Sequence, residues 1–341
     1  MRVVRTSLWI NPVYDQMMQA EPGIQLDILN VQGDPDAGWQ QLAQAHVYQI
    51  AATKDDLPKI FFAHQSLLDR CPNLLVVSSN GAGFDTVDAQ ACTAAGILVV
   101  NQSGGNARSV AEHTFGLMLG LSRKMIECDR KMHRTTRLTR EEVMGHEITG
   151  KTLGLIGIGM VGRQVAAIAQ AFQMKVLAHD PWVAPDEIRR RGAEPVDLNT
   201  LLAQSDVVSL HCPRDESTLK MMNAQRFARM KRGALFITTA RGGIHDEQAL
   251  ADALQSGHLA GAGLDVWDQE PPPLDHPLLA LDQVYATFHT AGVTHEARQA
   301  VATMGAQQLI DWKNHLQLPP RCANPQAWGA HLVRRQKILG F

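Results

Sequence analysis

The chain has 341 residues, and because most domains hold roughly 100 to 200 residues this length predicts two domains that each bury a core. Lys and Arg total 32 against 34 Asp and Glu, a formal net charge of −2 that argues against a nucleic-acid-binding surface. No apolar run reaches the ~18 residues of a membrane span, and no signal peptide is predicted. The five cysteines include no CxxC pair, which predicts a cytoplasmic, metal-free protein with reduced thiols.

Short apolar runs alternate with helical segments in the first hundred residues, which is typical of an open parallel α/β sheet. The expected strands lie near residues 2–10, 24–29, 45–50, 74–78 and 97–100. Residues 101–106, Asn-Gln-Ser-Gly-Gly-Asn, then predict a loop that ends this first domain.

A long amphipathic helix is expected next. Ser109 and Glu112 have the spacing of a capping box at its start. Apolar or small residues follow at helical spacing, at Val110, Thr114, Leu117, Met118, Leu121 and Met125. This stripe indicates either a buried core face or a subunit interface, and the pattern does not choose between them.

A second set of six strands follows, as a complete doubly wound dinucleotide-binding unit requires. These strands are expected near residues 152–156, 175–179, 207–211, 234–238, 260–264 and 284–287. A helix-forming stretch from about Glu296 to Trp312 follows, and if it packs back on the first domain, that domain is discontinuous.

The first of these strands runs into Gly157-Ile-Gly159-Met-Val-Gly162 and then a helical segment, which is the context that gives a GxGxxG pattern meaning. The glycines allow a tight turn and close approach to a pyrophosphate, and the helix N-terminus offers N–H groups to the anion. Asp180 ends the next strand, where a carboxylate accepts hydrogen bonds from a ribose and repels a 2′-phosphate. The sequence therefore predicts NAD rather than NADP, and Arg189, Arg190 and Arg191 are interpreted as a solvated helix face.

Three later segments carry a more specific pattern. They are Phe236-Ile-Thr-Thr-Ala-Arg-Gly-Gly243, Gly263-Leu-Asp-Val-Trp-Asp-Gln-Glu-Pro271 and Ala286-Thr-Phe-His-Thr-Ala-Gly292. With these motifs, from about residue 45 to 325, the chain resembles the D-isomer-specific 2-hydroxyacid dehydrogenases, such as phosphoglycerate, glycerate and hydroxypyruvate dehydrogenases. Phe288 stands where that family usually has proline.

The resemblance implies a catalytic set. Arg241 would bind the substrate carboxylate and 2-oxo group, for which a planar, permanently charged guanidinium is suited. His289 would be the acid–base residue and Glu270 its hydrogen-bonding partner. Asp265 would hold the nicotinamide carboxamide.

The resemblance also implies the remaining binding residues. For the substrate carboxylate these are the backbone of Gly81, Ala82 and Gly83, with Asn80 adding a side-chain contact. For NAD they are Gly157, Gly159, Met160, Val161, Gly162 and Asp180, together with Val110, His211, Cys212, Pro213, Thr218, Thr239, Ala240, Asp265 and Gly292.

The identity of the substrate is less determined. Phosphoglycerate-specific relatives carry an arginine where this chain has Ala51-Ala52-Thr53-Lys54, which argues against phosphate recognition there. Glu270 argues against formate, because the formate-oxidising branch has glutamine. Five cations between Arg130 and Arg140 are either a solvated loop or, through Arg134 or Arg137, a contact to a second negative group on the partner subunit's substrate.

The expected fold is thus α/β, with two doubly wound parallel-sheet domains and a Rossmann NAD-binding domain inserted in a flavodoxin-like substrate domain. The expected boundaries are 1–103 and 293–341 for the substrate domain and 104–292 for the NAD domain. The resemblance implies a homodimer that reduces a small 2-oxo acid or oxidises a D-2-hydroxy acid. Composition and cysteine usage predict a cytoplasmic protein with no nucleic-acid or membrane partner. The alternatives are an NAD-sensing, corepressor-like scaffold and an oxidoreductase for amino-acid-type or phosphonate substrates.

Overall fold

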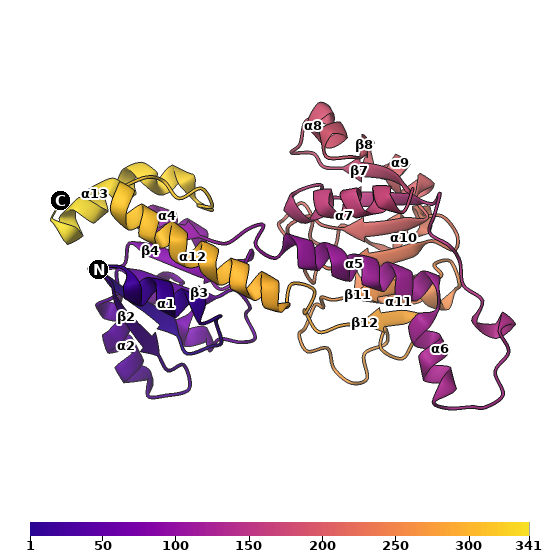
Figure 1. Ribbon diagram of the computed structural model, residues 1–341, viewed down its shortest axis with the longest axis horizontal. Helices are drawn as coiled ribbons and strands as arrows, with labels where there is room; N and C mark the ends of the chain where they lie inside the picture. Colours follow the sequence, from indigo (N-terminus) through magenta and orange to yellow (C-terminus); the bar gives the residue numbers. More distant parts are fainter. Residues whose placement is uncertain (341) are drawn as a thin grey trace. The chain divides into compact units, whose positions relative to one another are not determined.

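The computed structural model describes residues 1–340 and divides them into two compact units. One unit combines Met1–Asn106 with the segment from Thr294 onward, and the other is Ala107–Val293. Each unit contains one sheet (Figure 1). We refer to them as the discontinuous unit and the central unit.

The sheet of the discontinuous unit is entirely parallel, in the order β2-β1-β3-β4-β5, which is the flavodoxin-like order. Its strands are β1 (Arg2–Thr6), β2 (Gln25–Leu29), β3 (Val47–Ala51), β4 (Val76–Asn80) and β5 (Leu98–Val100). The expected strand over 2–10 was too long, since β1 ends at Thr6 where its pairing with β2 stops at Leu29. The chain then turns through Asn11 and Pro12 into the first helix.

Helices cover both faces of this sheet (Figure 1). They are α1 (Val13–Ala20), α2 (Pro35–Ala43), α3 (Gln65–Leu68), α4 (Ala89–Ala94), α12 (His295–His315) and α13 (Trp328–Leu339), with 3₁₀ turns η1 (Lys59–Phe61) and η3 (Pro325–Ala327). The helix expected from about Glu296 is therefore confirmed as α12, and it packs against α1.

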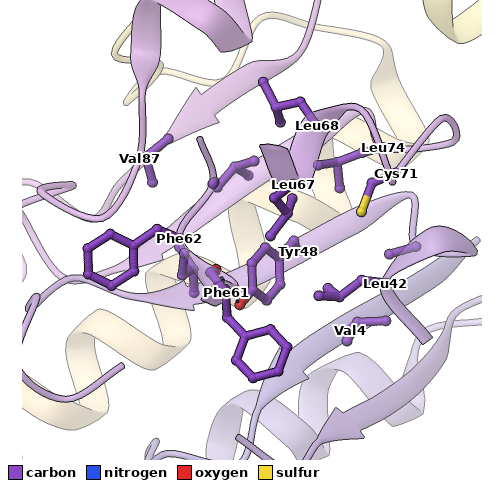
Figure 2. Close-up of a cluster of buried hydrophobic side chains, with 14 of the residues drawn as sticks. Val4, Leu42, Tyr48, Phe61, Phe62, Leu67, Leu68, Cys71, Leu74 and Val87 are labelled. Atoms are coloured by element: carbon purple, nitrogen blue, oxygen red, sulfur yellow. Dashed lines mark hydrogen bonds between the residues drawn. The ribbon is translucent and has the colours of Figure 1, made fainter. Parts of the chain in front are cut away.

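Successive strand residues point to opposite faces of the sheet and so bury two separate cores. Val3, Val47 and Val76 pack with α1 and α12. Their neighbours in sequence, Val4, Tyr48 and Val77, face the other side, where Leu42 of α2 and Leu67 of α3 join them (Figure 2). Two buried faces explain why consecutive residues of each strand are apolar at these positions.

The C-terminal helix α13 is tied to this unit through His331, which is fully buried. Its Nε2 accepts a hydrogen bond from Trp312 Nε1 at 3.1 Å, and its Nδ1 lies 3.2 Å from the carbonyl of Gly96. The Trp328 ring stacks on the imidazole at 5.5 Å. The neutral ring with a proton on Nδ1 satisfies both bonds, whereas a second proton on Nε2 would face the indole N–H.

The sheet of the central unit is also parallel, in the order β12-β11-β10-β9-β6-β7-β8. Its strands are β6 (Thr152–Ile156), β7 (Lys175–His179), β8 (Glu194–Pro195), β9 (Val207–Leu210), β10 (Leu235–Thr238), β11 (Gly261–Leu264) and β12 (Val284–Ala286). This is the Rossmann order with one more strand, and the strand order reverses between β6 and β9. The expected set of six omitted β8, which has only two residues, one of them proline, and so carries no apolar pattern.

Helices lie on both faces of this sheet as well (Figure 1). They are α5 (Ala107–Ser122), α6 (Met125–Met132), α7 (Met160–Ala171), α8 (Pro185–Arg190), α9 (Leu198–Gln204), α10 (Ala224–Arg229) and α11 (Glu247–Gln255), with the 3₁₀ turn η2 (Glu141–Val143). Side chains of α5 and α7 share one core with the sheet, and those of α9, α10 and α11 share the other. The predicted fold class is confirmed.

The long helix differs from its prediction at both ends. It begins at Ala107, so Ser109 lies inside its first turn and is not the predicted capping residue. Lys124 adopts a left-handed φ of 51° and separates α5 from α6, which leaves Met125 59% exposed instead of in the buried stripe. The other stripe residues, Val110, Thr114, Leu117, Met118 and Leu121, are buried within the unit. Among residues 1–340, no helix is long and apolar enough to cross a bilayer.

Acid should destabilise the discontinuous unit through His331. Burial lowers the pKa of His331 from 6.5 to about 4. Between these two pH values the unfolded chain binds a proton that the folded chain does not, so the free energy of unfolding falls as pH falls, by about 3 kcal/mol over the window. Urea unfolding followed by tryptophan fluorescence at pH 7 and pH 4.5 should show a smaller acid-induced loss in His331→Gln than in the wild type. The exposed His315→Gln is the control, and equal losses in both variants would contradict this role.

Candidate active site

Three neighbouring strands of the central unit bring the predicted catalytic residues to one edge. Strands β10, β11 and β12 are adjacent and parallel, so their carboxyl ends meet at the same edge of the sheet. Arg241 follows β10, Glu270 follows β11 and His289 follows β12. Residues that are far apart in sequence thus reach one place.

His289 and Glu270 form a direct pair. His289 Nδ1 lies 2.7 Å from Glu270 Oε2, and Glu270 Oε1 accepts a hydrogen bond from the backbone N–H of Trp267 at 3.0 Å. Partial burial alone would raise the pKa of Glu270, but the hydrogen bond and charge of His289 outweigh it and lower that pKa below its usual 4.5. An ionised Glu270 only accepts, so Nδ1 donates its proton to Glu270 and Nε2 is the ring nitrogen that faces away from this bond.

Arg241 is held against the same loops by the packing of its backbone. A side chain on the next residue, Gly242, would place its Cβ 1.8 Å from the carbonyl oxygen of Trp267, so only glycine allows this approach. The Arg241 guanidinium donates to the carbonyl of Ala240 at 2.7 Å. Its positive charge also contributes to the lowered pKa of Glu270.

Asp265, at the end of β11, organises the loop that carries His289. The carboxylate is 1% exposed and accepts hydrogen bonds from Thr287 Oγ1 at 2.6 Å, from Thr290 N at 2.8 Å and from Ala291 N at 2.9 Å. Its backbone carbonyl accepts from His289 N at 2.7 Å. These bonds to the loop are what the structure shows for Asp265, and the predicted contact to a nicotinamide carboxamide stays a prediction.

His289 itself adopts a left-handed backbone with a φ of 47°, which is uncommon for a residue with a side chain. Such a conformation persists only where the surroundings enforce it. The hydrogen bonds to Asp265 provide that constraint on both sides of His289. Phe288, the departure from the family pattern, is 57% exposed and leaves these bonds intact.

His113, on α5, is a site residue that the sequence reasoning missed. Its Nε2 lies 3.0 Å from Thr287 Oγ1, whose own proton goes to Asp265, so His113 donates to the hydroxyl. It sits three positions after Val110 on the same helix, but helical spacing alone does not reveal a partner 174 residues away.

The glycine-rich turn between β6 and α7 has the shape of a pyrophosphate cradle. Gly157 has a φ of 92°, and a Cβ there would lie 2.7 Å from the backbone N of Cys212. A Cβ on Gly162 would lie 2.4 Å from the carbonyl oxygen of Gly157, whereas one on Gly159 would meet no described atom within 4 Å. Gly159 also precedes α7 without a side-chain cap. Backbone atoms therefore pack tightly against Gly157 and Gly162, whereas the space beside Gly159 is open. The turn also lies where the strand order reverses, so its residues fit a dinucleotide.

Asp180 follows β7 and lies beside this turn. Its Oδ2 accepts from Ile158 N at 3.0 Å and its Oδ1 accepts from Trp182 N at 3.1 Å, which leaves a lone pair on each oxygen for ribose hydroxyls. The interpretation of Arg191 as part of a solvated face was wrong. Its guanidinium donates to the carbonyl of Ile158 at 2.8 Å and pairs with Glu187, because α8 packs beside the turn.

The other predicted NAD contacts lie at the same edge of the central sheet or on α5. His211, Cys212 and Pro213 follow β9, and Thr218 Oγ1 donates to the carbonyl of Pro213 at 2.8 Å. Thr239 and Ala240 follow β10, with Thr239 buried near Thr114. Val110 is on α5, Met160 and Val161 begin α7, and Gly292 follows the His289 loop. Their contacts to a cofactor remain predictions.

The loop expected to bind the substrate carboxylate follows β4 in the discontinuous unit. Its carbonyls are held: Gly81 O accepts from Gln102 N at 2.7 Å, Ala82 O from Asn101 Nδ2 at 3.0 Å, and Gly83 O from Ser79 Oγ at 2.6 Å. Within residues 1–340 the N–H groups of Ala82 and Gly83 make no hydrogen bond. The loop therefore presents donors, which suits a carboxylate.

The fold and this set of residues define a Rossmann-type dinucleotide-binding protein with a histidine–glutamate pair at the carboxyl edge of its sheet. Residues 115–291 match the family model described as the D-isomer-specific 2-hydroxyacid dehydrogenase NAD-binding domain. The chain belongs to this family, and the predictions of the family and of NAD as its cofactor are confirmed. Within residues 1–340, no cluster of His, Cys, Asp or Glu is arranged to hold a metal ion.

Relatives within the family differ in length and in substrate. The chain is 42% identical over 245 residues to the D-3-phosphoglycerate dehydrogenase of Archaeoglobus fulgidus, covering 72% of this chain but only 46% of that protein. It is 37% identical over 263 residues to the glyoxylate reductase of Korarchaeum cryptofilum, covering 76% of this chain and 79% of that protein. The crystal structure of D-lactate dehydrogenase from Aquifex aeolicus, complexed with NAD and lactic acid, superposes with a TM-score of 0.81 at 28% identity, covering 94% of this chain and 99% of that chain.

The Thr287 hydroxyl should stabilise the His289 loop. Replacing it by the isosteric Thr287→Val removes the bonds to His113 and Asp265 and leaves Asp265 Oδ1 with one partner fewer. We expect the free energy of unfolding to fall by about 1–2 kcal/mol, measured by denaturant titration at pH 7. The matched control is Thr290→Val, whose side chain is exposed in the same loop. A similar loss in both variants would show that the hydroxyl contributes nothing specific.

Proposed function

We propose that this protein is an NAD-dependent D-2-hydroxyacid dehydrogenase that works on small 2-hydroxy and 2-oxo acids, chiefly as a 2-oxo acid reductase. The observation that carries the proposal is the 2.7 Å contact between His289 and Glu270, beside the loop that holds Arg241. A histidine, its carboxylate partner and an arginine at the carboxyl edge of a Rossmann sheet suit proton transfer at a carbon bearing a hydroxyl group.

Each group has a defined part in the proposal. The turn from Gly157 to Gly162 and the carboxylate of Asp180 would hold NAD, which would supply hydride chemistry at C2 of the acid. His289 Nε2 removes the hydroxyl proton in oxidation and returns a proton to the oxo group in reduction. Glu270 keeps the proton on Nδ1 and stabilises the imidazolium that forms. Arg241 binds the carboxylate and 2-oxo group, and the N–H groups of Ala82 and Gly83 are offered to a carboxylate.

The roles of the two domains follow from the same assignment. In the proposal, residues 104–292 bind NAD, whereas 1–103 and 293–341 bind the substrate. Homodimerisation is supported by four large apolar side chains that stand exposed within one segment, Met125, Ile126, Met132 and Met144. The contact of Arg134 or Arg137 with a partner subunit's substrate and the cytoplasmic location stay predictions.

The proposed activity predicts a defined loss on removing the imidazole. The wild-type chain should oxidise NADH with at least one of glyoxylate, pyruvate and hydroxypyruvate, monitored at 340 nm in parallel with NADPH. His289→Gln should lower turnover by ~10² or more while NADH binding, measured by fluorescence titration, survives. The exposed His295→Gln serves as control. Near-normal turnover in His289→Gln would refute its role, and NADH binding without reduction of any acid would favour the scaffold alternative.

Asp180 should set the preference for NADH. Asp180→Asn keeps an oxygen to accept the Ile158 N–H but removes the charge that repels a 2′-phosphate. We expect the ratio of kcat/KM for NADH over NADPH to fall about tenfold in this variant. Asp186→Asn, an exposed position on α8, should leave the ratio unchanged. A ratio equal to that of the wild type in Asp180→Asn would remove Asp180 from cofactor selection.

A further inference from the structure

One aromatic residue contacts all three segments that carry the predicted catalytic residues. Trp267, in the loop after β11, is only 3% exposed. Its backbone N–H donates to Glu270 Oε1 at 3.0 Å, and its carbonyl oxygen packs against Gly242, the neighbour of Arg241. Any residue would make these two backbone contacts. The third contact belongs to the indole ring and therefore depends on the identity of the side chain.

The indole N–H of Trp267 reaches the segment after β12. It donates to the carbonyl oxygen of Thr287 at 3.1 Å. That carbonyl belongs to the peptide group between Thr287 and Phe288, and the next peptide group leads into His289. The bond thus acts on the backbone immediately before the predicted acid–base residue.

The peptide group between Thr287 and Phe288 has few other constraints. A peptide group can be held through its N–H and through its C=O. Among residues 1–340, the N–H of Phe288 makes no hydrogen bond, and the Thr287 carbonyl accepts one from the Trp267 indole alone. A proline at position 288 would restrict this backbone through its ring, which fixes φ at about −65°. Phe288 has no such ring, so the indole N–H is what holds the plane of this peptide group.

The Trp267 ring is itself held in one orientation by His276. The two rings meet edge to face, with their centroids 5.4 Å apart. His276 Nδ1 accepts a hydrogen bond from Leu278 N at 3.3 Å, so the proton is on Nε2, which lies 3.0 Å from Glu247 Oε2. Because the imidazole is held at both nitrogens, it gives the indole a fixed surface to pack against.

Loss of the indole bond would act on His289. The backbone of His289 is left-handed, with a φ of 47°, a conformation that persists only where the surroundings enforce it. Asp265 holds the N–H of His289 and the hydroxyl of Thr287, but neither bond fixes the plane of the peptide group between Thr287 and Phe288. Rotation of that plane would move the imidazole relative to Glu270, which lies 2.7 Å from it.

We propose that Trp267 is a positioning residue whose indole N–H holds the peptide group before His289 and so keeps the imidazole aligned with Glu270. The inference rests on the proposed function, and it deepens that function by adding a residue that acts through His289 and Glu270. Such a residue affects the alignment of the proton-transfer group and not the binding of the cofactor. Its loss should therefore lower kcat and leave the KM for NADH unchanged.

Steady-state kinetics of the full chain tests this role with Trp267→Phe, which removes the N–H but keeps an aromatic ring against His276. With NADH and the best substrate among glyoxylate, pyruvate and hydroxypyruvate, we expect kcat to fall about tenfold and the KM for NADH to stay within about twofold of wild type. The matched control is Trp312→Phe, which removes a similarly buried indole N–H bond of 3.1 Å, to His331 in the discontinuous unit. It should lower Tm but not kcat. Equal losses of kcat in the two variants would show that Trp267 contributes stability alone and would overturn the inference.

A second substitution separates the positioning of the peptide group from the packing of the ring. Phe288→Pro supplies through its own ring the restriction that the indole N–H supplies in the wild type, and it removes an N–H that has no partner among residues 1–340. It should raise the kcat of Trp267→Phe by more than it raises that of the wild-type chain. A double variant that melts like Trp267→Phe but stays equally slow would overturn the inference.

The same assays distinguish this inference from the proposed function. If the wild-type chain reduces at least one of the three acids and Trp267→Phe is just as fast, this inference alone fails. If the wild-type chain reduces none of them, the proposed function fails and this inference fails with it.

Discussion

The arrangement of the loop that carries His289 depends on one buried carboxylate. Asp265 is almost inaccessible to solvent, and a buried charge is tolerated only when hydrogen bonds replace its hydration. Three donors from the segment after β12 supply that replacement, two of them backbone N–H groups. The need to solvate Asp265 therefore fixes the path of this segment, and with it the left-handed conformation and direction of His289. Misplacing the carboxylate would release the histidine from Glu270.

The fold was largely predictable because its strands are parallel and covered on both sides, which makes them short apolar runs bounded by turns. The predicted element boundaries are wrong where tertiary contacts, and not the local sequence, determine where a helix or strand begins or ends. The break at Lys124 follows no helix-breaking residue, and β8 is a strand only because β7 lies beside it. The start of α5 two residues before Ser109 shows that a capping pattern does not prevent a helix from beginning earlier.

The residues of the candidate site could be predicted only where a sequence motif contains them. The resemblance to the family singled out Arg241, Glu270 and His289, and their catalytic roles stay predictions. The structure brings them to one edge because each follows one of three neighbouring parallel strands. His113 and Arg191 escaped because their partners, Thr287 and Ile158, are set by helix packing and not by spacing along the chain.

The interruption of one unit by the other has a consequence for biosynthesis. The ribosome releases the first five strands well before α12, because the whole of Ala107–Val293 is made in between. The face formed by Val3, Val47 and Val76 then lacks the cover of α12, while the second unit already has every strand it needs. Folding during translation should therefore finish in the middle of the chain first, and the nascent N-terminal sheet is the part that most needs a chaperone until the last helices emerge.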